Sequence, residues 1–207
     1  KGNILVYAVG KYLLSVPREV FLKSSINRGS EITEKEIENI TFEINSYKAK
    51  SRALNLLSYR AHSKKELEDK LKRKLGMKIW DYISIKRVDA AKRKLGEESA
   101  KIATEKMEKI GLLNDENYAR EFANHLQKNK MYAKKRIAYE LSKKGINDEV
   151  ISDVLNNLEM DEDETLEKIV SKKTIENEKD KRRLIAHLMR LGYSWSQINR
   201  FLKSEDY

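Results

Sequence analysis

The sequence predicts a mainly α-helical protein, an elongated array of three tandem three-helix repeats preceded by a small β-hairpin and helix. The main observation is a short pattern that occurs three times. Two apolar residues lie four positions apart, a glycine ends the segment, and many lysines and arginines surround them. Such a repeat is typical of stacked helical units that share a continuous core and present an extended surface. The copies are Leu67/Leu71/Gly76, Ile137/Leu141/Gly145 and Leu184/Leu188/Gly192.

The spacing of the copies indicates that the first repeat is longer than the others. Matched positions lie 47 residues apart between the second and third copies, as from Ile137 to Leu184, but 70 apart between Leu67 and Ile137. We place the resulting insertion at about 78–98. The predicted segments are an α/β N-terminal module at 1–45, repeat one at 46–113, repeat two at 114–160 and repeat three at 161–207.

The N-terminal module is predicted to begin with a β-hairpin. Residues 4–7 and 12–16 are rich in strand-forming residues, and Gly10-Lys11 is expected to form the turn between them. A module of this size is too small to be very stable alone. Because a helical array needs its open ends covered, we expect the module to cap repeat one.

Two helices are predicted after the hairpin. Pro17, the single proline of the chain, suits the first turn of a short helix over about 17–25, where its missing N–H has no partner. Thr33 and Glu36 form a capping-box pattern for a helix toward Asn45.

Apolar residues at helical spacing predict three helices in each repeat. Capping-box patterns at Ser63/Glu66 and Ser194/Gln197 mark two of the helix starts, and Gly111 ends the third helix of repeat one. The helices are marked by Ala53/Leu54/Leu57/Ala61, Leu67/Leu71 and Ile102/Met107/Ile110 in repeat one, by Tyr118/Phe122/Leu126, residues 133–144 and Val150/Val154/Leu158 in repeat two, and by Leu166/Ile169/Val170, residues 179–191 and Trp195/Ile198/Leu202 in repeat three.

Several classes of protein find no support in the sequence. The absence of cysteine excludes disulfides and thiolate metal sites. The longest apolar run, residues 4–9, is too short to span a bilayer or to act as a signal sequence. We therefore expect a soluble, cytoplasmic bacterial protein without a membrane partner. Since the chain begins with Lys1 rather than methionine, we expect residues to precede it.

Catalysis also finds little support. His62, His125 and His187 are far apart and have no metal-ligand spacing, and there is no glycine-rich phosphate loop. The acidic run 161–164 is interpreted as a helix N-terminus. We expect no enzyme activity, no metal and no cofactor.

The formal net charge of +10 comes entirely from the repeats, because residues 1–45 hold equal numbers of basic and acidic residues. This surplus predicts a polyanionic partner, either nucleic acid or an acidic protein surface. The cations concentrate on the second helix of each repeat and on the loop before it, although such clusters are often only solvated faces. Tyr132 and Tyr139 could stack on bases there or serve only as packing. The candidate contact residues are Lys64, Lys65 and Lys70 in repeat one, Lys128, Lys130, Tyr132, Lys134, Lys135, Arg136, Lys143 and Lys144 in repeat two, and Lys181, Arg182 and Arg183 in repeat three.

Four segments of the sequence carry a family resemblance. The segment 134–145 reads Lys-Lys-Arg-Ile-Ala-Tyr-Glu-Leu-Ser-Lys-Lys-Gly, and 111–115 reads Gly-Leu-Leu-Asn-Asp before Tyr118-Ala119. The other two are the first repeat, with Leu54-Leu57-Ser58-Arg60-His62-Ser63-Glu66-Leu67, and the ending Leu191-Gly192-Tyr193-Ser194-Ile198. Together they resemble the RecX family of bacterial RecA regulators. The resemblance spans about 50–203, and the N-terminal hairpin and helix resemble an extension of some members. Two features depart from the family pattern. They are the insertion at about 78–98 and the position of Gly76, which lies one residue farther from Leu71 than Gly145 lies from Leu141.

This resemblance implies a function in DNA repair, homologous recombination and the SOS response. It implies a protein that binds the RecA filament on DNA, lies along its groove, and inhibits ATP hydrolysis, strand exchange and co-protease activity. The partners would be RecA and single- or double-stranded DNA, contacted directly or through RecA, by a monomer of this chain. The alternatives are a general nucleic-acid-binding helical protein without a recombinase partner and a scaffold that joins other proteins.

Overall fold

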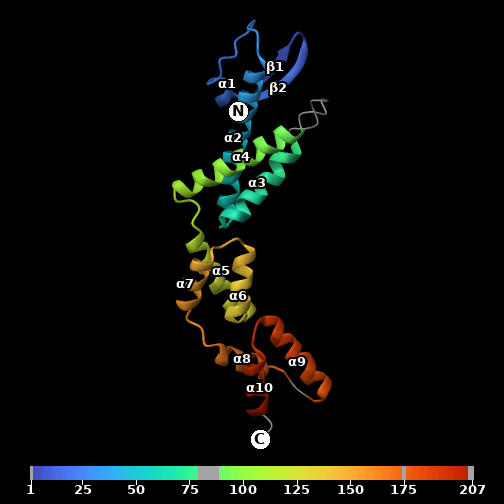
Figure 1. Ribbon diagram of the computed structural model, residues 1–207, viewed down its shortest axis with the longest axis vertical. Helices are drawn as coiled ribbons and strands as arrows, with labels where there is room; N and C mark the ends of the chain where they lie inside the picture. The colour runs from blue at the N-terminus through green and yellow to red at the C-terminus, as the bar shows by residue number, and fades with distance from the viewer. Residues whose placement is uncertain (1, 79–88, 174–175, 205–207) are drawn as a thin grey trace. The chain divides into compact units, whose positions relative to one another are not determined.

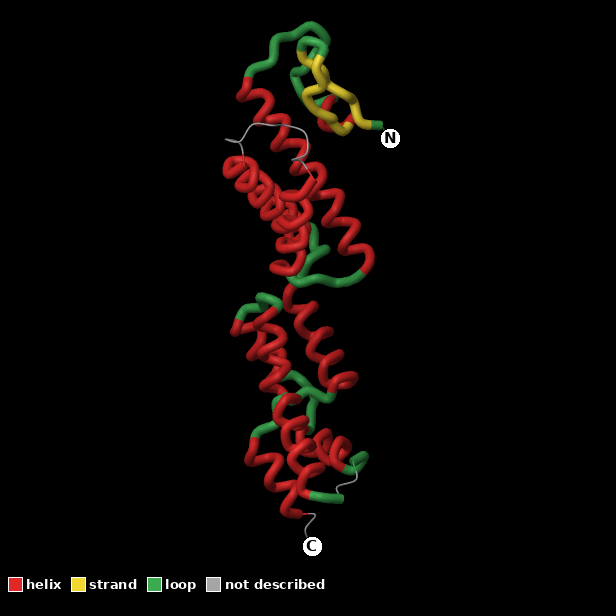
Figure 2. The backbone as a smooth tube through the Cα atoms, turned by 90° about the vertical axis from the view of Figure 1, so that its right-hand side faces the viewer, coloured by secondary structure: helices red, strands yellow, loops and turns green. Residues whose placement is uncertain are grey.

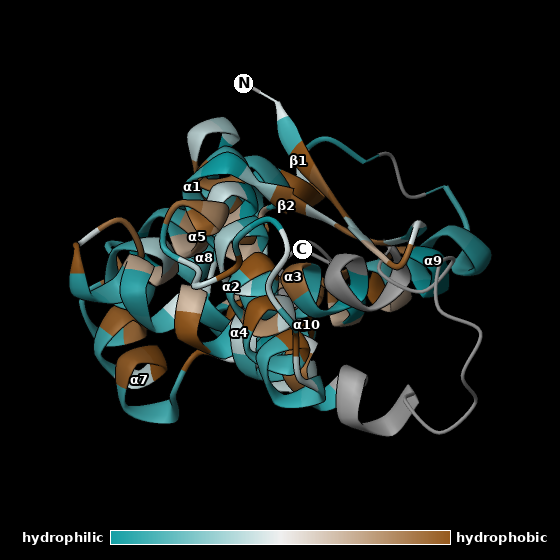
Figure 3. Cartoon of the chain, turned by 90° about the horizontal axis from the view of Figure 1, so that it is seen from above, coloured by the Kyte–Doolittle hydropathy of each residue, from teal (hydrophilic) through white to brown (hydrophobic). Residues whose placement is uncertain are grey.

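The computed structural model describes residues 2–78, 89–173 and 176–204, and the chain forms two compact units, 1–113 and 114–207. The fold is mainly helical with one two-stranded antiparallel sheet, as predicted (Figure 1). Most helices carry both apolar and polar residues (Figure 3), as expected for helices with one buried face. None of the described helices is long and apolar enough to cross a membrane.

The β-hairpin consists of β1 (Asn3–Ala8) and β2 (Lys11–Pro17), drawn in yellow in Figure 2. The turn lies at Val9 and Gly10, which have φ values of 49° and 73°. Two left-handed residues are what a two-residue hairpin turn requires, so the prediction of Gly10-Lys11 was one position late. The helix that follows, α1 (Arg18–Phe21), is shorter than the predicted 17–25, and Pro17 precedes it as its N-cap residue.

One continuous helix, α2 (Glu34–Tyr59), replaces the two predicted on either side of residue 45. Its capping box is present: the Thr33 backbone N–H donates to Glu36 at 2.8 Å, and the Glu36 N–H donates to the Thr33 hydroxyl at 3.3 Å. The first half of α2 packs on the hairpin and α1, and its second half packs in repeat one. The N-terminal module and repeat one therefore share this helix. The buried residues of the first cluster are Val16, Val20, Ile40 and Ile44.

Repeat one is completed by α3 (Lys64–Lys78) and α4 (Asp89–Lys109), which lie beside α2 (Figure 1). Gly76 lies within α3, so the prediction that it ends this helix was wrong. Residues 89–98 of the predicted insertion form the first half of α4, and 79–88 lie outside the described residues. The buried cluster consists of Ala49, Ala53, Leu67, Leu71, Ala100, Ala103, Met107 and Leu113.

The apolar faces predicted for α2 and α4 were partly wrong. Ile102 and Ile110 are 42% and 54% exposed, Leu54 is 39% exposed, and Ala61 is also exposed. Alanines line the buried sides of both helices instead. Small side chains occupy the contact between α2 and α4, and this pushes several of the larger apolar residues to the outside.

The second unit contains two three-helix repeats. The helices of repeat two are α5 (Asp115–Lys130), α6 (Lys134–Lys143) and α7 (Asp148–Asn156). Those of repeat three are α8 (Glu162–Val170), α9 (Glu178–Leu191) and α10 (Trp195–Ser204). All six were predicted. Trp195, however, is 55% exposed and does not belong to the buried face of α10.

The three copies of the sequence pattern occupy equivalent core positions. Leu67, Leu71, Ile137, Leu141 and Leu188 are fully buried, and Leu184 is 5% exposed. Gly145 and Gly192 follow the second helices of their repeats in the left-handed conformation, with φ values of 77° and 100°. The periodicity of the sequence thus corresponds to the buried faces of the second helices.

Candidate functional site

The basic residues of repeat two surround the turn between α5 and α6. Met131 ends α5 in the left-handed conformation, with φ at 53°, and α6 begins three residues later. Lys128, Lys130 and Lys135 are exposed, and within the described parts of the chain none of them has an ion-pair partner. Their charges are therefore not neutralised by any residue in the described parts of the chain.

Arg136 is held differently from these lysines. Its guanidinium lies over two tyrosine rings, 5.4 Å from the Tyr132 centroid and 5.2 Å from that of Tyr139. The same group forms an ion pair of 2.7 Å with Glu140 one turn later. Arg136 thus joins Tyr132, which precedes α6, to Tyr139 and Glu140 on α6, and its charge is balanced within the repeat.

The two tyrosines of this cluster differ in exposure. Tyr139 is 54% exposed, whereas Tyr132 is half-buried against the core of repeat two. Lys143 lies over the Tyr139 ring at 5.3 Å and near Glu140 at 3.9 Å. Packing therefore accounts for Tyr132, and Tyr139 is the more exposed of the two, although Arg136 and Lys143 both lie over its ring.

The remaining two predicted contacts of repeat two, Lys134 at the start of α6 and Lys144 just after its end, are partly covered. Lys144 lies over the Phe122 ring at 5.8 Å. Lys134 lines an open cavity of about 430 Å³ together with residues of the acidic run. The cavity is lined by Lys134, Met160, Asp161, Glu162, Asp163, Gln197 and Arg200.

The basic cluster of repeat three lies on the first turns of α9. Arg182 is exposed and has no ion-pair partner among the described residues. Arg183 lies 3.5 Å from Asp180, and Lys181 is half-buried. The three residues are consecutive on α9. Of the three, Arg182 alone is both exposed and without an ion-pair partner among the described residues.

The basic cluster of repeat one is mostly paired. Lys64 forms an ion pair of 2.6 Å with Glu108 of α4. Lys70 lies 3.2 Å from Glu66 and 2.9 Å from the His62 Nε2. Lys65 is exposed and has no ion-pair partner within the described ranges. In repeat one, ion pairs within the fold therefore neutralise Lys64 and Lys70, two of the three cations predicted to contact a partner.

His62 is a buried member of this cluster, only 3% exposed. Its Nδ1 lies 2.9 Å from the Arg60 carbonyl oxygen, so a neutral ring can donate there and accept from Lys70 at Nε2. Burial lowers the pKa of His62 below its usual value, and the nearby positive charges of Arg60 and Lys70 act in the same direction. Among the described residues, no group of three or more histidine and acidic side chains is arranged to hold a metal ion.

Comparison with known proteins identifies the family. The regulatory protein RecX of Caldanaerobacter subterraneus subsp. tengcongensis is 30% identical over 189 residues, which cover 91% of this chain and 84% of that protein. This chain belongs to the RecX family. The regulatory proteins RecX of Clostridium acetobutylicum and Bacillus subtilis are 25% and 27% identical, each over 98% of this chain and over 90% and 72% of their own lengths.

The RecX family models match two of the three repeats. Residues 49–75 match the first three-helix domain of RecX, and 114–155 match the second. A crystal structure of regulatory protein RecX has a TM-score of 0.60 at 23% identity and covers 96% of this chain and 92% of that one. The crystal structure of RecX from Lactobacillus salivarius has a TM-score of 0.53 at 24% identity, covering 78% and 97%. These likenesses show the RecX fold.

Two residues of this RecX family member lie at the site but were not among the predicted contacts. Glu162 and Gln197 lie at the junction of repeats two and three, beside Lys134. The sequence signals were present, since Glu162 belongs to the acidic run and Gln197 to a capping box. From the sequence alone, both are interpreted only as local helix signals. For the acidic run that interpretation is confirmed, because Asp161 accepts hydrogen bonds from the N–H groups of Asp163 and Glu164 at the start of α8.

Proposed function

We propose that this RecX family member binds the RecA filament on DNA and inhibits RecA's ATP hydrolysis, strand exchange and co-protease activity. Membership of a family of regulatory proteins and the resemblance to RecA regulators support this proposal. The observation that carries it is a set of exposed cations without ion-pair partners in the described parts of the chain. Those among the predicted contact residues are Lys65 on α3, Lys128 and Lys130 in the last turn of α5, Lys135 on α6 and Arg182 on α9.

Unpaired cations suit a polyanionic partner for an energetic reason. A lysine already paired inside the fold must lose that pair before it can bind a phosphate or a carboxylate. Lys128, Lys130 and Lys135 have no such pair with any described residue, and binding releases the counterions of the polyanion. Of the predicted contacts in repeat two, these three lysines are therefore the main candidates.

Inhibition needs only a difference in affinity between filament states. A protein that contacts the filament more favourably in one state shifts the population toward that state. If the preferred state hydrolyses ATP slowly, binding across neighbouring RecA protomers inhibits the ATPase without any catalytic group in this chain.

The test is RecA's DNA-dependent ATPase measured at increasing concentrations of this protein. The triple variant Lys128→Gln, Lys130→Gln and Lys135→Gln is expected to raise the half-inhibitory concentration by about tenfold, which corresponds to about 1.4 kcal/mol of binding free energy. Lack of inhibition by the wild-type protein at any stoichiometry contradicts the proposed function. Full inhibition by the folded variant contradicts the assigned residues.

A matched control comes from α4. Lys101, Lys106 and Lys109 are also exposed lysines without ion-pair partners among the described residues. Lys106 and Lys109 lie in the last turn of α4, as Lys128 and Lys130 do in α5, so the same helix-dipole interactions are removed. The corresponding glutamine triple variant changes the net charge equally and is expected to inhibit like wild type.

The same unpaired lysines also suit a nucleic acid without RecA. In that case, binding to DNA alone falls steeply as the salt concentration rises, because each phosphate contact releases a counterion. A protein interface with an apolar centre depends less on salt. Strong, salt-sensitive DNA binding with no effect on RecA favours a general DNA-binding protein.

A further inference from the structure

The helix that carries the basic cluster of repeat two lacks a cap of its own. Ala133 is the N-cap residue of α6 and provides no side-chain hydrogen bond. The first turn contains Lys134, Lys135 and Arg136 but no acidic residue. Cations at a helix N-terminus oppose the helix dipole, and the first N–H groups of a helix have no partner within it. The basic cluster therefore makes the start of α6 unfavourable in isolation.

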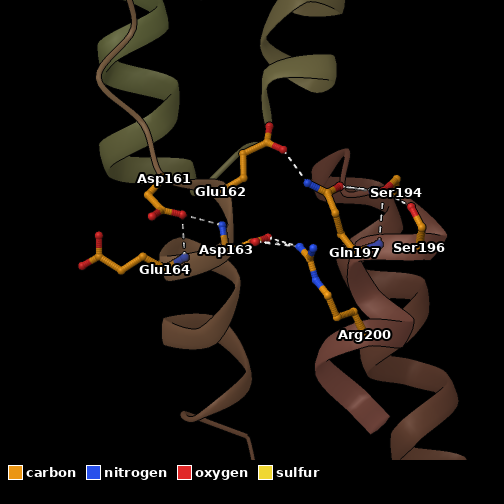
Figure 4. Close-up of polar contacts among 8 residues, drawn as sticks. All are labelled: Asp161, Glu162, Asp163, Glu164, Ser194, Ser196, Gln197 and Arg200. Carbon is orange, nitrogen blue, oxygen red and sulfur yellow. Dashed lines mark hydrogen bonds and ion pairs between the residues drawn. The ribbon is translucent and has the colours of Figure 1, made fainter. Parts of the chain in front are cut away.

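A carboxylate from repeat three compensates for this defect. Glu162, in the first turn of α8, accepts a hydrogen bond from the Lys134 backbone N–H at 2.6 Å. Its other oxygen accepts from the Gln197 Nε2 at 2.7 Å. Gln197 is itself held by Ser194 at the start of α10, and Figure 4 shows Glu162 and Gln197 pointing toward each other. Glu162 thus caps a helix of one repeat while it is oriented by another.

Further contacts join the two repeats at the same place. The Ala133 N–H donates to the Leu191 carbonyl at 2.9 Å, and the Tyr193 hydroxyl donates to the Met131 carbonyl at 3.2 Å. Burial raises the pKa of Tyr193, so its hydroxyl stays protonated and able to donate. Ala133, only 1% exposed, belongs to the buried cluster of repeat three although it begins a helix of repeat two.

We propose that Glu162 is a positioning residue that clamps the start of α6 to repeat three, so that the cations of α6 and α9 are presented on one rigid element. The proposal deepens the proposed function by naming what holds its contact residues in place. Its structural part does not depend on RecA. When the cations are already fixed relative to one another, less conformational entropy is lost on binding a partner whose anionic groups repeat at a regular spacing.

The test compares Glu162→Gln with Asp163→Asn. The new amide at position 162 keeps one acceptor oxygen but presents an NH₂ group to a second donor, so one of the two hydrogen bonds is lost. Asp163 lies in the same first turn of α8 and accepts two hydrogen bonds from Arg200, at 2.7 and 2.6 Å, within repeat three. The control therefore removes an equal charge from the same helix end without touching repeat two.

The first measurement is amide hydrogen exchange of the full chain by NMR. Exchange at the Lys134 amide is expected to be at least about tenfold faster in Glu162→Gln than in Asp163→Asn, since its charged acceptor is replaced by one neutral amide oxygen for which Gln197 also competes. The Leu141 amide, in the buried half of α6, reports global opening and is expected to change equally in both variants. Equal rates at Lys134 in the two variants overturn the proposal.

The second measurement is a distance distribution between spin labels. Because the chain contains no cysteine, Ser152→Cys on α7 and Ala186→Cys on α9, both exposed, give two unique labels. Glu162→Gln is expected to broaden the distribution, and an unchanged distribution overturns the clamp.

In the RecA ATPase assay, Glu162→Gln is expected to raise the half-inhibitory concentration severalfold. Equal inhibition by both variants, despite a broadened distribution, overturns the role of the clamp in binding. Absence of inhibition by wild type contradicts only the proposed function.

Discussion

Gly192 packs directly against Arg136: a β-carbon added to Gly192 would lie 2.6 Å from the Arg136 Cβ and 2.9 Å from its backbone nitrogen. No side chain fits in that space, and the φ value of 100° at Gly192 is also one that other residues rarely adopt. Glycine is therefore required here both to end α9 and to let repeat three approach the first turn of α6.

Gly192→Ala is expected to destabilise the protein by at least about 2 kcal/mol, because backbone strain adds to an overlap that must push the repeats apart. The measurement is urea unfolding of the full chain. Gly111→Ala is the control, since Gly111 has a similar φ value of 74° but open space around its missing β-carbon. It should cost only about 1 kcal/mol. Equal losses in the two variants contradict the steric role of Gly192.

Leu141→Ala and Leu188→Ala are each expected to cost about 2–5 kcal/mol, because both side chains are fully buried and their removal leaves a cavity. Thermal unfolding followed by circular dichroism measures the loss. Leu112→Ala is the control: this side chain is 52% exposed, and its loss should change stability by only about 0.5 kcal/mol. A small effect at Leu141 and Leu188 speaks against equivalent core positions in the repeats.

Ser194→Ala is expected to destabilise repeat three by about 1 kcal/mol through the loss of the N-cap of α10. The Ser194 hydroxyl accepts from the Gln197 N–H at 3.3 Å and donates to its side-chain oxygen at 2.7 Å. Ser196→Ala removes a hydroxyl whose one hydrogen-bond partner among the described residues is the Ser194 hydroxyl, so it should have little effect. Denaturation midpoints of the two variants provide the comparison, and equal midpoints count against the cap.

The stability of the first unit is expected to fall as the pH drops below about 6.5. Burial lowers the pKa of folded His62 from 6.5, so the unfolded chain binds a proton that the folded chain resists. The contribution is complete above the unfolded pKa and is lost as the pH falls toward the lower folded value. Urea midpoints between pH 5 and 8, in wild type and His62→Gln, measure this dependence. An NMR titration that places the folded pKa of His62 at or above 6.5 contradicts it.

Arg136→Ala is expected to cost about 1–2 kcal/mol of stability, because it removes contacts with two tyrosine rings. Lys135→Ala, one position earlier, removes an exposed cation and should change stability by no more than about 0.5 kcal/mol. Chemical denaturation separates the two roles. If Arg136→Ala is as stable as Lys135→Ala, the tyrosine contacts do not stabilise the fold, and Arg136 is again a candidate for contact with a partner.

Most of the helical architecture could be predicted because its signals are local. Apolar spacing, capping boxes and glycines act within one helix, and they placed all six helices of the second unit. The errors in the apolar faces of the first unit come from packing between helices. The alanine-lined contact of α2 and α4 leaves Ile102 and Ile110 exposed, and no local pattern reveals that.

The candidate site shows the same division. The sequence predicted the cations on the second helices and on the loops before them. Lys65, Lys135 and Arg182 do lie on second helices, but Lys128 and Lys130 lie in the last turn of α5, a first helix. The sequence did not distinguish Lys135, which has no ion-pair partner among the described residues, from Arg136, which lies over two tyrosine rings, or from Lys64 and Lys70, which are paired. Which cation is neutralised depends on which acidic or aromatic side chain packs beside it.

The repeat, the helices and the basic surplus of this protein follow from the sequence, because each depends on residues within a few turns of one another. The clamp at Glu162 depends on the folded arrangement instead. It joins Glu162 to Lys134, far apart in the chain, through the contact of repeats two and three. Hydrogen bonds between distant segments form only when packing brings their donors and acceptors together, and this contact determines how the basic helix α6 is held.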